Sequence, residues 1–262
     1  MLWTIASIAL GFYPIHYFLT RYPKILHLIH KPAFAAKHIS HRGGAGESVE
    51  NTLDAFKRAI NCGTDMLELD VHLTKDNEVV VAHDSELARA FCARQTSTIE
   101  DVNFRELPLY KEEIELTFYP GHFHRESDPL LRRIPKLEDI FSAFPGVPIN
   151  LDIKFNDDVL IDKVACLIES FNREKITVWG SFSQEVSNKC FRRNPTIPRF
   201  FPFRDAVLYI LYFHLGLLTY MKCHYTHMEL PSLSIMLWVT DFVRLLFLIQ
   251  EKVSTPSSND AA

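Results

Sequence analysis

The sequence lacks the features of several protein classes. Its 262 residues carry a formal net charge of -4, so no basic excess is present to attract nucleic acid. The five cysteines are scattered, odd in number and never spaced as Cys-x-x-Cys, which argues against a disulfide framework and a zinc knuckle. No internal repeat of fixed period is visible. The chain is 47% hydrophobic, which is enough for one large domain with a hydrophobic core. The cysteines are expected to be free thiols in a reducing compartment.

Charged residues are also missing from residues 1–20, and this segment predicts an N-terminal membrane anchor. Its length suits one membrane-spanning helix, which needs roughly 20 mostly apolar residues. A buried helix and a cleaved signal peptide are the alternatives, but no basic residue precedes the apolar run, as a signal peptide would require. By the positive-inside rule, the downstream domain is expected in the cytosol, because the anchor is followed by Arg21, Lys24, Lys31 and Lys37.

The rest of the chain predicts one α/β domain. Residues 21–37 are expected to be a basic juxtamembrane linker, 38–252 the catalytic domain with an irregular insert at 92–133, and 253–262 a disordered polar tail. Alternating strand and helix patterns imply a parallel sheet and a TIM-type (β/α)₈ barrel, whose sites lie at the carboxyl ends of the strands. The expected strands are 38–41, 66–73, 78–82, 148–154 and 176–180, and the expected helices are 51–62, 137–144, 159–171 and 184–192.

A second uncharged stretch, residues 206–221, interrupts this alternation. It is shorter than a comfortable membrane span. Two interpretations are equally supported: a buried helix of the barrel, or a segment that dips into a membrane near the mouth of the active site.

The residue types that suit catalysis gather in the first half of the domain. Glu68 and Asp70 lie two positions apart in a predicted strand, so their carboxylates face the same side. Apolar neighbours surround them, and a buried carboxylate needs a partner such as a metal ion. Two histidines and an arginine end nearby apolar runs: His41, Arg42 and His83. This combination predicts metal-assisted chemistry on an anionic substrate.

Six short motifs carry a resemblance to a known family. They are His-Arg-Gly-Gly at 41–44, Glu-Asn-Thr at 50–52, Glu-Leu-Asp at 68–70, Thr-Lys-Asp at 74–76, His-Asp at 83–84 and the strand Asn-Leu-Asp-Ile-Lys at 150–154. In this order they resemble the glycerophosphodiester phosphodiesterase family. The N-terminal anchor and the apolar insert resemble its membrane-bound lysophospholipase D branch, which implies a location at the endoplasmic reticulum. The resemblance covers roughly residues 1–235.

The resemblance implies a function and a role for each site residue. The expected reaction is hydrolysis of a lysophospholipid or glycerophosphodiester at a membrane, which releases the head-group alcohol. His41 and His83 are similar to the family's general acid and base, and Arg42 and Lys154 to its phosphate contacts. One divalent cation, Mg²⁺ or Ca²⁺, is implied, with three oxygen ligands and a possible additional acidic group: Glu68, Asp70, Asp152 and Glu229. Asp152 stands where bacterial relatives carry glutamate.

The resemblance ends before the last strands of the family's barrel. A Trp-x-Val-Asn motif and a Thr-Asp-x-Pro motif are expected there, and neither is present. Val239-Thr240-Asp241 contains the Thr-Asp pair of the second motif but lacks its proline. The barrel is therefore expected to be incomplete at its C-terminal end. This suggests an alternative function, a shortened and catalytically impaired isoform that acts as a membrane-bound binding or regulatory protein.

Overall fold

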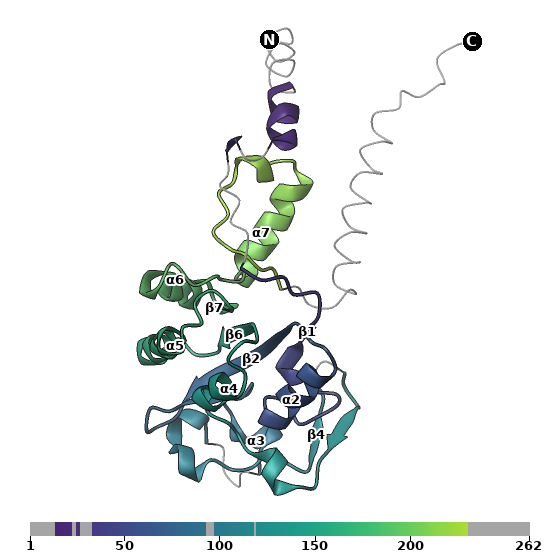
Figure 1. The fold of residues 1–262 in the computed structure, drawn as a ribbon, viewed down its shortest axis with the longest axis vertical. Coiled ribbons are helices and arrows are strands. Elements are labelled where there is room, and N and C mark those ends of the chain that lie inside the picture. Colours follow the sequence, from purple (N-terminus) through teal and green to yellow (C-terminus); the bar gives the residue numbers. More distant parts are fainter. Residues whose placement is uncertain (1–13, 23–24, 27–32, 93–96, 118, 230–262) are drawn as a thin grey trace, which may run out of the picture. The chain divides into compact units, whose positions relative to one another are not determined.

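The computed structural model describes residues 14–22, 25–26, 33–92, 97–117 and 119–229 (Figure 1). The chain divides into two compact units, Met1–His227 and Met228–Ala262, and the fold below is that of the first. In chain order its elements are β1 (Ile39–Ser40), η2 (His41–Gly43), α2 (Leu53–Asn61), β2 (Met66–Leu73), β3 (Val79–Val81), α3 (Leu87–Ala90), η3 (Ile99–Asp101), η4 (Phe104–Glu106), β4 (Glu113–Glu115), β5 (Phe123–Arg125), η5 (Pro129–Arg132), α4 (Leu137–Ala143), β6 (Ile149–Ile153), α5 (Asp158–Ser170), β7 (Thr177–Gly180), α6 (Gln184–Arg193), α7 (Phe203–His214) and η6 (Leu218–Tyr220).

The central sheet is parallel and open. Its strand order is β1-β2-β6-β7, with every neighbouring pair parallel, and β3 adds to β2 as an antiparallel strand. The turn at 75–77 explains β3, because it is too short for a parallel crossover and Asn77 supplies the positive φ of 62° that a tight turn needs. Among the described strands, none joins β7 back to β1. The predicted α/β class and parallel sheet are confirmed, and the described strands do not close into a barrel.

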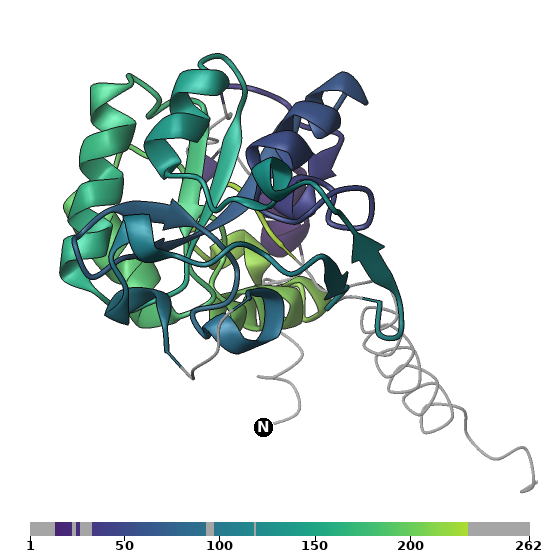
Figure 2. The ribbon, with the colours of Figure 1, turned by 90° about the horizontal axis from the view of Figure 1, so that it is seen from below.

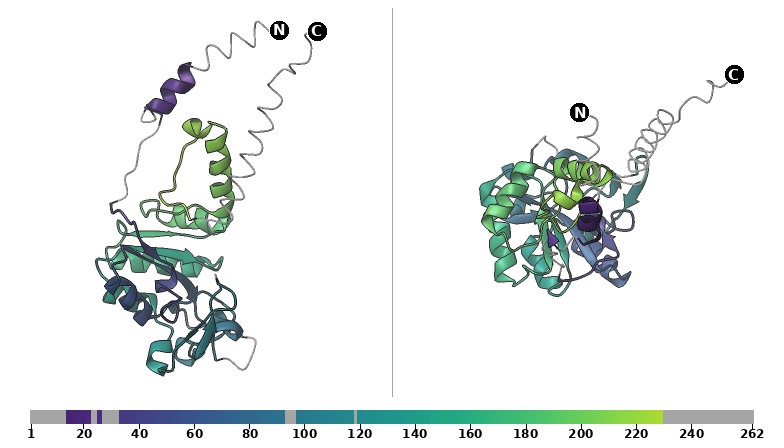
Figure 3. Two further views of the ribbon diagram at one scale, coloured as in Figure 1. Left: turned by 90° about the vertical axis from the view of Figure 1, so that its right-hand side faces the viewer. Right: turned by 90° about the horizontal axis from the view of Figure 1, so that it is seen from above.

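One face of the sheet is covered by helices. The odd-numbered residues of β2, such as Leu67 and Leu69, pack with apolar residues of α2, α4, α5 and α6 in one buried cluster. Helix α2 begins where predicted, because the Thr52 hydroxyl accepts a hydrogen bond of 3.2 Å from the backbone N–H of Ala55. Figures 1 and 2 and the right view of Figure 3 show α5 and α6 side by side at the edge of the ribbon.

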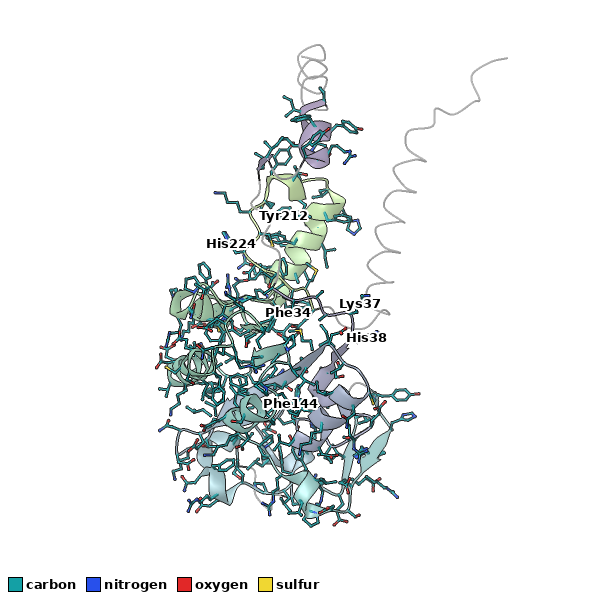
Figure 4. The ribbon with its side chains drawn as sticks, viewed as in Figure 1. Phe34, Lys37, His38, Phe144, Tyr212 and His224 are labelled. Atoms are coloured by element: carbon teal, nitrogen blue, oxygen red, sulfur yellow. The ribbon has the colours of Figure 1, made fainter. Side chains whose placement is uncertain are left out.

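The other face of the sheet has an apolar end and a charged end. Near the start of the strands, Met66, Val178 and Phe200 form a small buried cluster, against which Phe34 packs. Phe34, labelled in Figure 4, also stacks on the ring of His227 with 5.7 Å between centroids. Further along the same face stand the carboxylates of β2 and β6. We call this side the inner face.

The predicted irregular insert has a core of its own. Between residues 97 and 133 the chain forms three short 3₁₀ turns and an antiparallel hairpin, β4–β5, which the sequence did not predict. Tyr110 is fully buried and packs on Phe91 with 4.4 Å between ring centroids. These side chains join Val80 and Ala82 in a second apolar cluster. The segment therefore adds a packed layer beside β3.

The two uncharged segments, residues 206–221 and the predicted anchor at 1–20, were each given more than one interpretation from the sequence. Within the uncharged stretch 206–221, residues 206–214 belong to helix α7. Ala206 is the only buried residue of α7, so the interpretation of this stretch as a buried barrel helix is wrong. Residues 14–20 of the predicted anchor are helical, and the helix continues to residue 21, whereas residues 1–13 and the predicted tail lie outside the described residues. Among the helices that the structure describes, none is both long enough and apolar enough to cross a membrane.

Candidate active site

Three predicted acidic residues lie on the inner face of neighbouring strands. Glu68 and Asp70 alternate with the outward leucines of β2, and Asp152 of β6 stands directly opposite Asp70 in the register. All three residues are buried, with exposed fractions of 7%, 1% and 2%. Because β2 and β6 are parallel, their carboxyl ends meet at one edge of the sheet, and the alternation places the carboxylates side by side.

Lys154 supplies positive charge between two of these carboxylates. It follows β6, and its Nζ lies 2.8 Å from Oδ1 of Asp70 and 2.5 Å from Oδ2 of Asp152. Burial disfavours its charged form, but the two carboxylates outweigh burial and raise the Lys154 pKa. The same burial raises the Asp152 pKa, while the Asp70 pKa is lowered because Lys154, His83 and Arg42 together outweigh its desolvation. The two aspartates therefore differ in how firmly they hold their charge.

Arg42 is held by a strained loop. Its φ is +52°, a left-handed conformation that is uncommon for a residue with a side chain, and the following Gly43 has φ +76°. A Cβ at Gly43 would lie 2.8 Å from the Phe56 ring, so only glycine fits there. The backbone N–H of Arg42 donates to Oε2 of Glu68 over 2.8 Å, and its Nε lies 3.5 Å from Oδ2 of Asp70. The loop thus fixes Arg42 against both β2 carboxylates.

The two predicted catalytic histidines come from different elements. His41 opens η2, its side chain is 55% exposed, and its Nε2 lies 4.0 Å from Oε2 of Glu68. Burial of the ring and the neighbouring Arg42 lower the His41 pKa, and His83 acts in the same direction. His83 follows β3 and its Nδ1 lies 2.7 Å from Oδ1 of Asp84. Although part of the His41 side chain is open to solvent, the neighbouring atoms desolvate its ring, and the neutral imidazole suits a proton acceptor near neutral pH.

The residues fit an oxygen-ligated cation, although they do not form a complete cage. In the described part of the chain, no group of three or more His, Cys, Asp or Glu residues is arranged to hold a metal ion. In the described structure Glu68 accepts a hydrogen bond from the Arg42 amide, and the Lys154 ammonium lies between the two aspartates. Oδ1 of Asp152 is nevertheless buried without a hydrogen bond. A buried carboxylate oxygen of this kind suits a hard cation such as Mg²⁺ or Ca²⁺.

Several residues at the site were not given a role by the sequence. The Asn51 amide donates to Oδ2 of Asp70 over 2.9 Å, and the Thr117 hydroxyl accepts from Arg42 Nη1 over 3.0 Å. Glu50 and Arg89 add ion pairs around Arg42 and Asp84. Glu50 and Asn51 belong to the Glu-Asn-Thr motif, which was the available signal. Thr117 lies 75 residues from Arg42 in sequence, and Arg89, five residues after Asp84, belongs to none of the six motifs, so no local pattern indicated either of them.

The predicted additional acidic group, Glu229, is half-buried and belongs to the second unit, Met228–Ala262. Its relation to the carboxylates of β2 and β6 therefore remains a prediction.

Comparison with known proteins agrees with the motifs. The sequence profile of the glycerophosphoryl diester phosphodiesterase family matches residues 41–200. A human protein named lysophospholipase D GDPD1 is 43% identical over 227 residues, which cover 87% of this chain and 71% of that protein. Mouse lysophospholipase D GDPD3 is 40% identical over 208 residues, 78% of this chain and 61% of that protein.

The fold has a counterpart among solved structures. A crystal structure of a glycerophosphodiester phosphodiesterase from Agrobacterium tumefaciens aligns with a TM-score of 0.51 at 24% identity, over 64% of this chain and 67% of that one. At this identity the alignment supports the TIM-barrel-like architecture of the sheet and its helices.

Proposed function

The chain belongs to the glycerophosphoryl diester phosphodiesterase family and is a phosphodiester hydrolase; from this premise we propose that it cleaves lysophospholipids or glycerophosphodiesters in the manner of a lysophospholipase D. The products would be a head-group alcohol and lysophosphatidic acid or glycerol phosphate. The observation that carries this proposal is the inner-face cluster of Glu68, Asp70 and Asp152, with two cationic side chains against it and two histidines near it.

The two histidines would share the proton transfers. Cleavage of a phosphodiester requires removal of a proton from the attacking hydroxyl and delivery of a proton to the leaving alkoxide. His41 suits the acceptor role, because its lowered pKa keeps the imidazole neutral near pH 7. His83 would deliver the proton from Nε2, since its Nδ1 is engaged by Asp84. In this assignment His41 can deprotonate either water or a neighbouring hydroxyl of the substrate.

Arg42 and Lys154 would bind the phosphate. Both carry positive charge at the inner face, and a guanidinium can contact two phosphoryl oxygens at once. We also propose one divalent cation, Mg²⁺ or Ca²⁺, held by Glu68, Asp70 and Asp152. When bound, that ion would supply the positive charge that stabilises the phosphoryl oxygens as negative charge builds up on them. The buried Oδ1 of Asp152, which accepts no hydrogen bond, supports this choice of ligand.

The test is release of choline by the purified full chain from lysophosphatidylcholine and from glycerophosphocholine. His41→Ala and His83→Ala should each lower turnover by about 10²–10⁴-fold, the usual contribution of general acid–base catalysis. His122→Ala, at the exposed turn of the β4–β5 hairpin, is the matched control and should leave turnover unchanged. Turnover near the wild-type value in either site variant would remove the mechanism.

A second candidate function is a catalytically impaired chain that binds lysolipid and regulates at the membrane. The open sheet supports it, because β1 leads directly into His41 and Ile39 of β1 is 49% exposed. Loosening of a catalytic group by about 1 Å can cost on the order of 10²-fold in rate. Saturable binding of lysophosphatidylcholine without choline release, in the presence of Mg²⁺ or Ca²⁺, would favour this second function.

We propose that residues 1–20 anchor the protein to the endoplasmic reticulum membrane and that 21–37 link them to a cytosolic domain at 38–252. The uncharged composition of residues 1–20 and the basic residues after them support this topology. Deletion of 1–20 should move the protein from the membrane pellet towards the supernatant. Glycosylation of an acceptor site engineered into 92–133 would contradict the cytosolic assignment.

A further inference from the structure

A buried carboxylate joins two arginines at the edge of the candidate site. Glu50 lies in the loop between η2 and α2 and is 3% exposed. Its Oε2 lies 3.2 Å from Nη1 of Arg42, and its Oε1 lies 2.8 Å from Nη2 of Arg89. Each oxygen therefore faces a different guanidinium group. Because a buried carboxylate is stable only when it is paired, both contacts contribute to holding Glu50 in place.

Arg89 reaches in a second direction as well. From the short helix α3 its Nε donates to Oδ2 of Asp84, and its Nη1 lies 3.3 Å from the backbone oxygen of Glu115. The other oxygen of Asp84 faces Nδ1 of His83 at 2.7 Å. An unbroken series of ion pairs and hydrogen bonds thus runs from the phosphate-binding candidate Arg42 through Glu50, Arg89 and Asp84 to His83.

This arrangement determines which nitrogen of His83 carries its hydrogen. Burial alone would raise the Asp84 pKa, but the hydrogen bonds from His83 and Arg89 outweigh it and lower the pKa to about 2. Asp84 is therefore ionised near neutral pH and can only accept a hydrogen bond. Nδ1 of His83 must donate to it, which leaves Nε2 for proton exchange with a substrate.

We propose that Arg89 is a positioning residue: it holds Asp84, and through Asp84 the His83 ring, in a fixed orientation relative to Arg42. The inference rests on the proposed function for its catalytic consequence and on the contacts alone for its structural one. The two ends of the guanidinium divide the work, since Nε faces Asp84 and Nη2 faces Glu50. A lysine has a single ammonium group without this planar fork, so it cannot reproduce both contacts.

The kinetic test uses Arg89→Ala in the full chain. We expect kcat for choline release to fall on the order of 10²-fold, because a misplaced acid–base group loses rate, while KM changes by a smaller factor. The Arg89 side chain is 33% exposed, so free guanidinium ion can reach the vacated position. Added guanidinium chloride, at a concentration well below that which unfolds the chain, should restore part of kcat, and an equal concentration of sodium chloride should not.

Two further variants complete the kinetic comparison. Arg89→Lys should remain folded and show a kcat below that of the wild type. Arg125→Ala is the matched control, because Arg125 is 78% exposed and pairs only with Glu113 on the β4–β5 hairpin among the described contacts. Its kcat should equal the wild-type value. If Arg89→Ala does not fold, Arg89→Lys decides the question, and a wild-type kcat in that variant would overturn the proposal.

A direct structural test separates this inference from the proposed function. The ¹⁵N chemical shifts of His83 report which ring nitrogen carries hydrogen, whether or not the chain turns over any phosphodiester. The wild type should show hydrogen on Nδ1, and Arg89→Lys should show a mixture of tautomers. The same Nδ1–H form in both proteins would overturn the positioning role. Absence of turnover in the wild type would instead count against the proposed function and leave the tautomer comparison valid.

Discussion

Strands β2 and β6 differ from the α7–η6 segment in what they bury. All eight residues of β2 and all five of β6 are buried, although three of them are carboxylates. Helix α7, which is richer in apolar residues, buries only Ala206, and Phe213 on it is 65% exposed. The charged side chains are tolerated inside because each faces a cation or a donor, whereas the apolar side chains of α7 find no neighbouring core. Composition alone therefore does not decide burial; available partners do.

Removal of a buried charge should have the largest effect. Asp70 lies between Lys154, Arg42 and Asn51, and Asp70→Ala would leave two partly buried cations without their shared carboxylate. We expect the free energy of unfolding to fall by about 3–5 kcal/mol and choline release to be lost. Urea unfolding and the choline assay measure these effects. In the contrasting region, Arg204→Ala at the exposed start of α7 should change stability by less than about 0.5 kcal/mol.

Equal losses of unfolding free energy in Asp70→Ala and Arg204→Ala would contradict this difference between the two regions. They would mean that the charges of the site are no more buried in solution than those of α7.

A matched pair of leucines tests the apolar side of the same comparison. Leu151 of β6 is fully buried between the sheet and its helices, and Leu211 of α7 is 50% exposed. Leu151→Ala should lower the free energy of unfolding by about 2–5 kcal/mol, because it removes packed methyl groups and leaves a cavity. Leu211→Ala should lower it by less than about 0.5 kcal/mol. Denaturant midpoints at constant m-value give both numbers, and a large loss at Leu211 would show that α7 is packed in solution.

Much of this contrast could be read from the sequence. The strand at 66–73 and the helix capped by Thr52 were predicted to within one or two residues, because alternation and capping are local signals. The sequence also named the candidate site residues of β2 and β6, since the family motifs contain them; their catalytic role stays a prediction. The exposure of α7 could not be predicted, because an uncharged run has the same composition in a core, in a membrane or on a surface. The hairpin β4–β5 was missed because its mixed charges give no periodic pattern.

The contacts around His83 could be predicted from the sequence only in part. Its ring partner Asp84 is the next residue, so a role in orienting a histidine was within reach of sequence reasoning. Glu50 contacts Arg89 only after the chain folds, because the two residues are 39 positions apart, one before α2 and the other on α3. This contact depends on tertiary geometry rather than on local spacing.

A third prediction depends on pH and concerns Glu100, the partner of the buried histidine of β2. His72 lies 3.0 Å from Oε1 of Glu100 and 3.1 Å from the backbone oxygen of His83, and Glu100 also accepts from Ser85. Burial alone would raise the Glu100 pKa, but the hydrogen bonds from His72 and Ser85 outweigh it and lower the pKa from 4.5 to about 2.

Because the folded-state pKa is the lower one, the contribution of Glu100 to stability is fully present above pH 4.5 and is lost as pH falls towards 2. The difference in unfolding free energy between the wild type and Glu100→Gln should shrink over that interval. Urea unfolding at several pH values measures this difference, and a difference independent of pH would show that Glu100 is not paired as described.

We propose that the carboxylates of β2 and β6 serve phosphodiester cleavage together with a divalent cation. Choline release from lysophosphatidylcholine by the full chain, measured after exhaustive chelation and again after Mg²⁺ or Ca²⁺ is restored, tests this role. We predict that chelation abolishes turnover, that one of the two ions restores it in the wild type, and that neither restores it in Asp152→Asn, which keeps the size of the side chain but loses its charge. Turnover that survives chelation, or that returns equally in Asp152→Asn, would contradict the account.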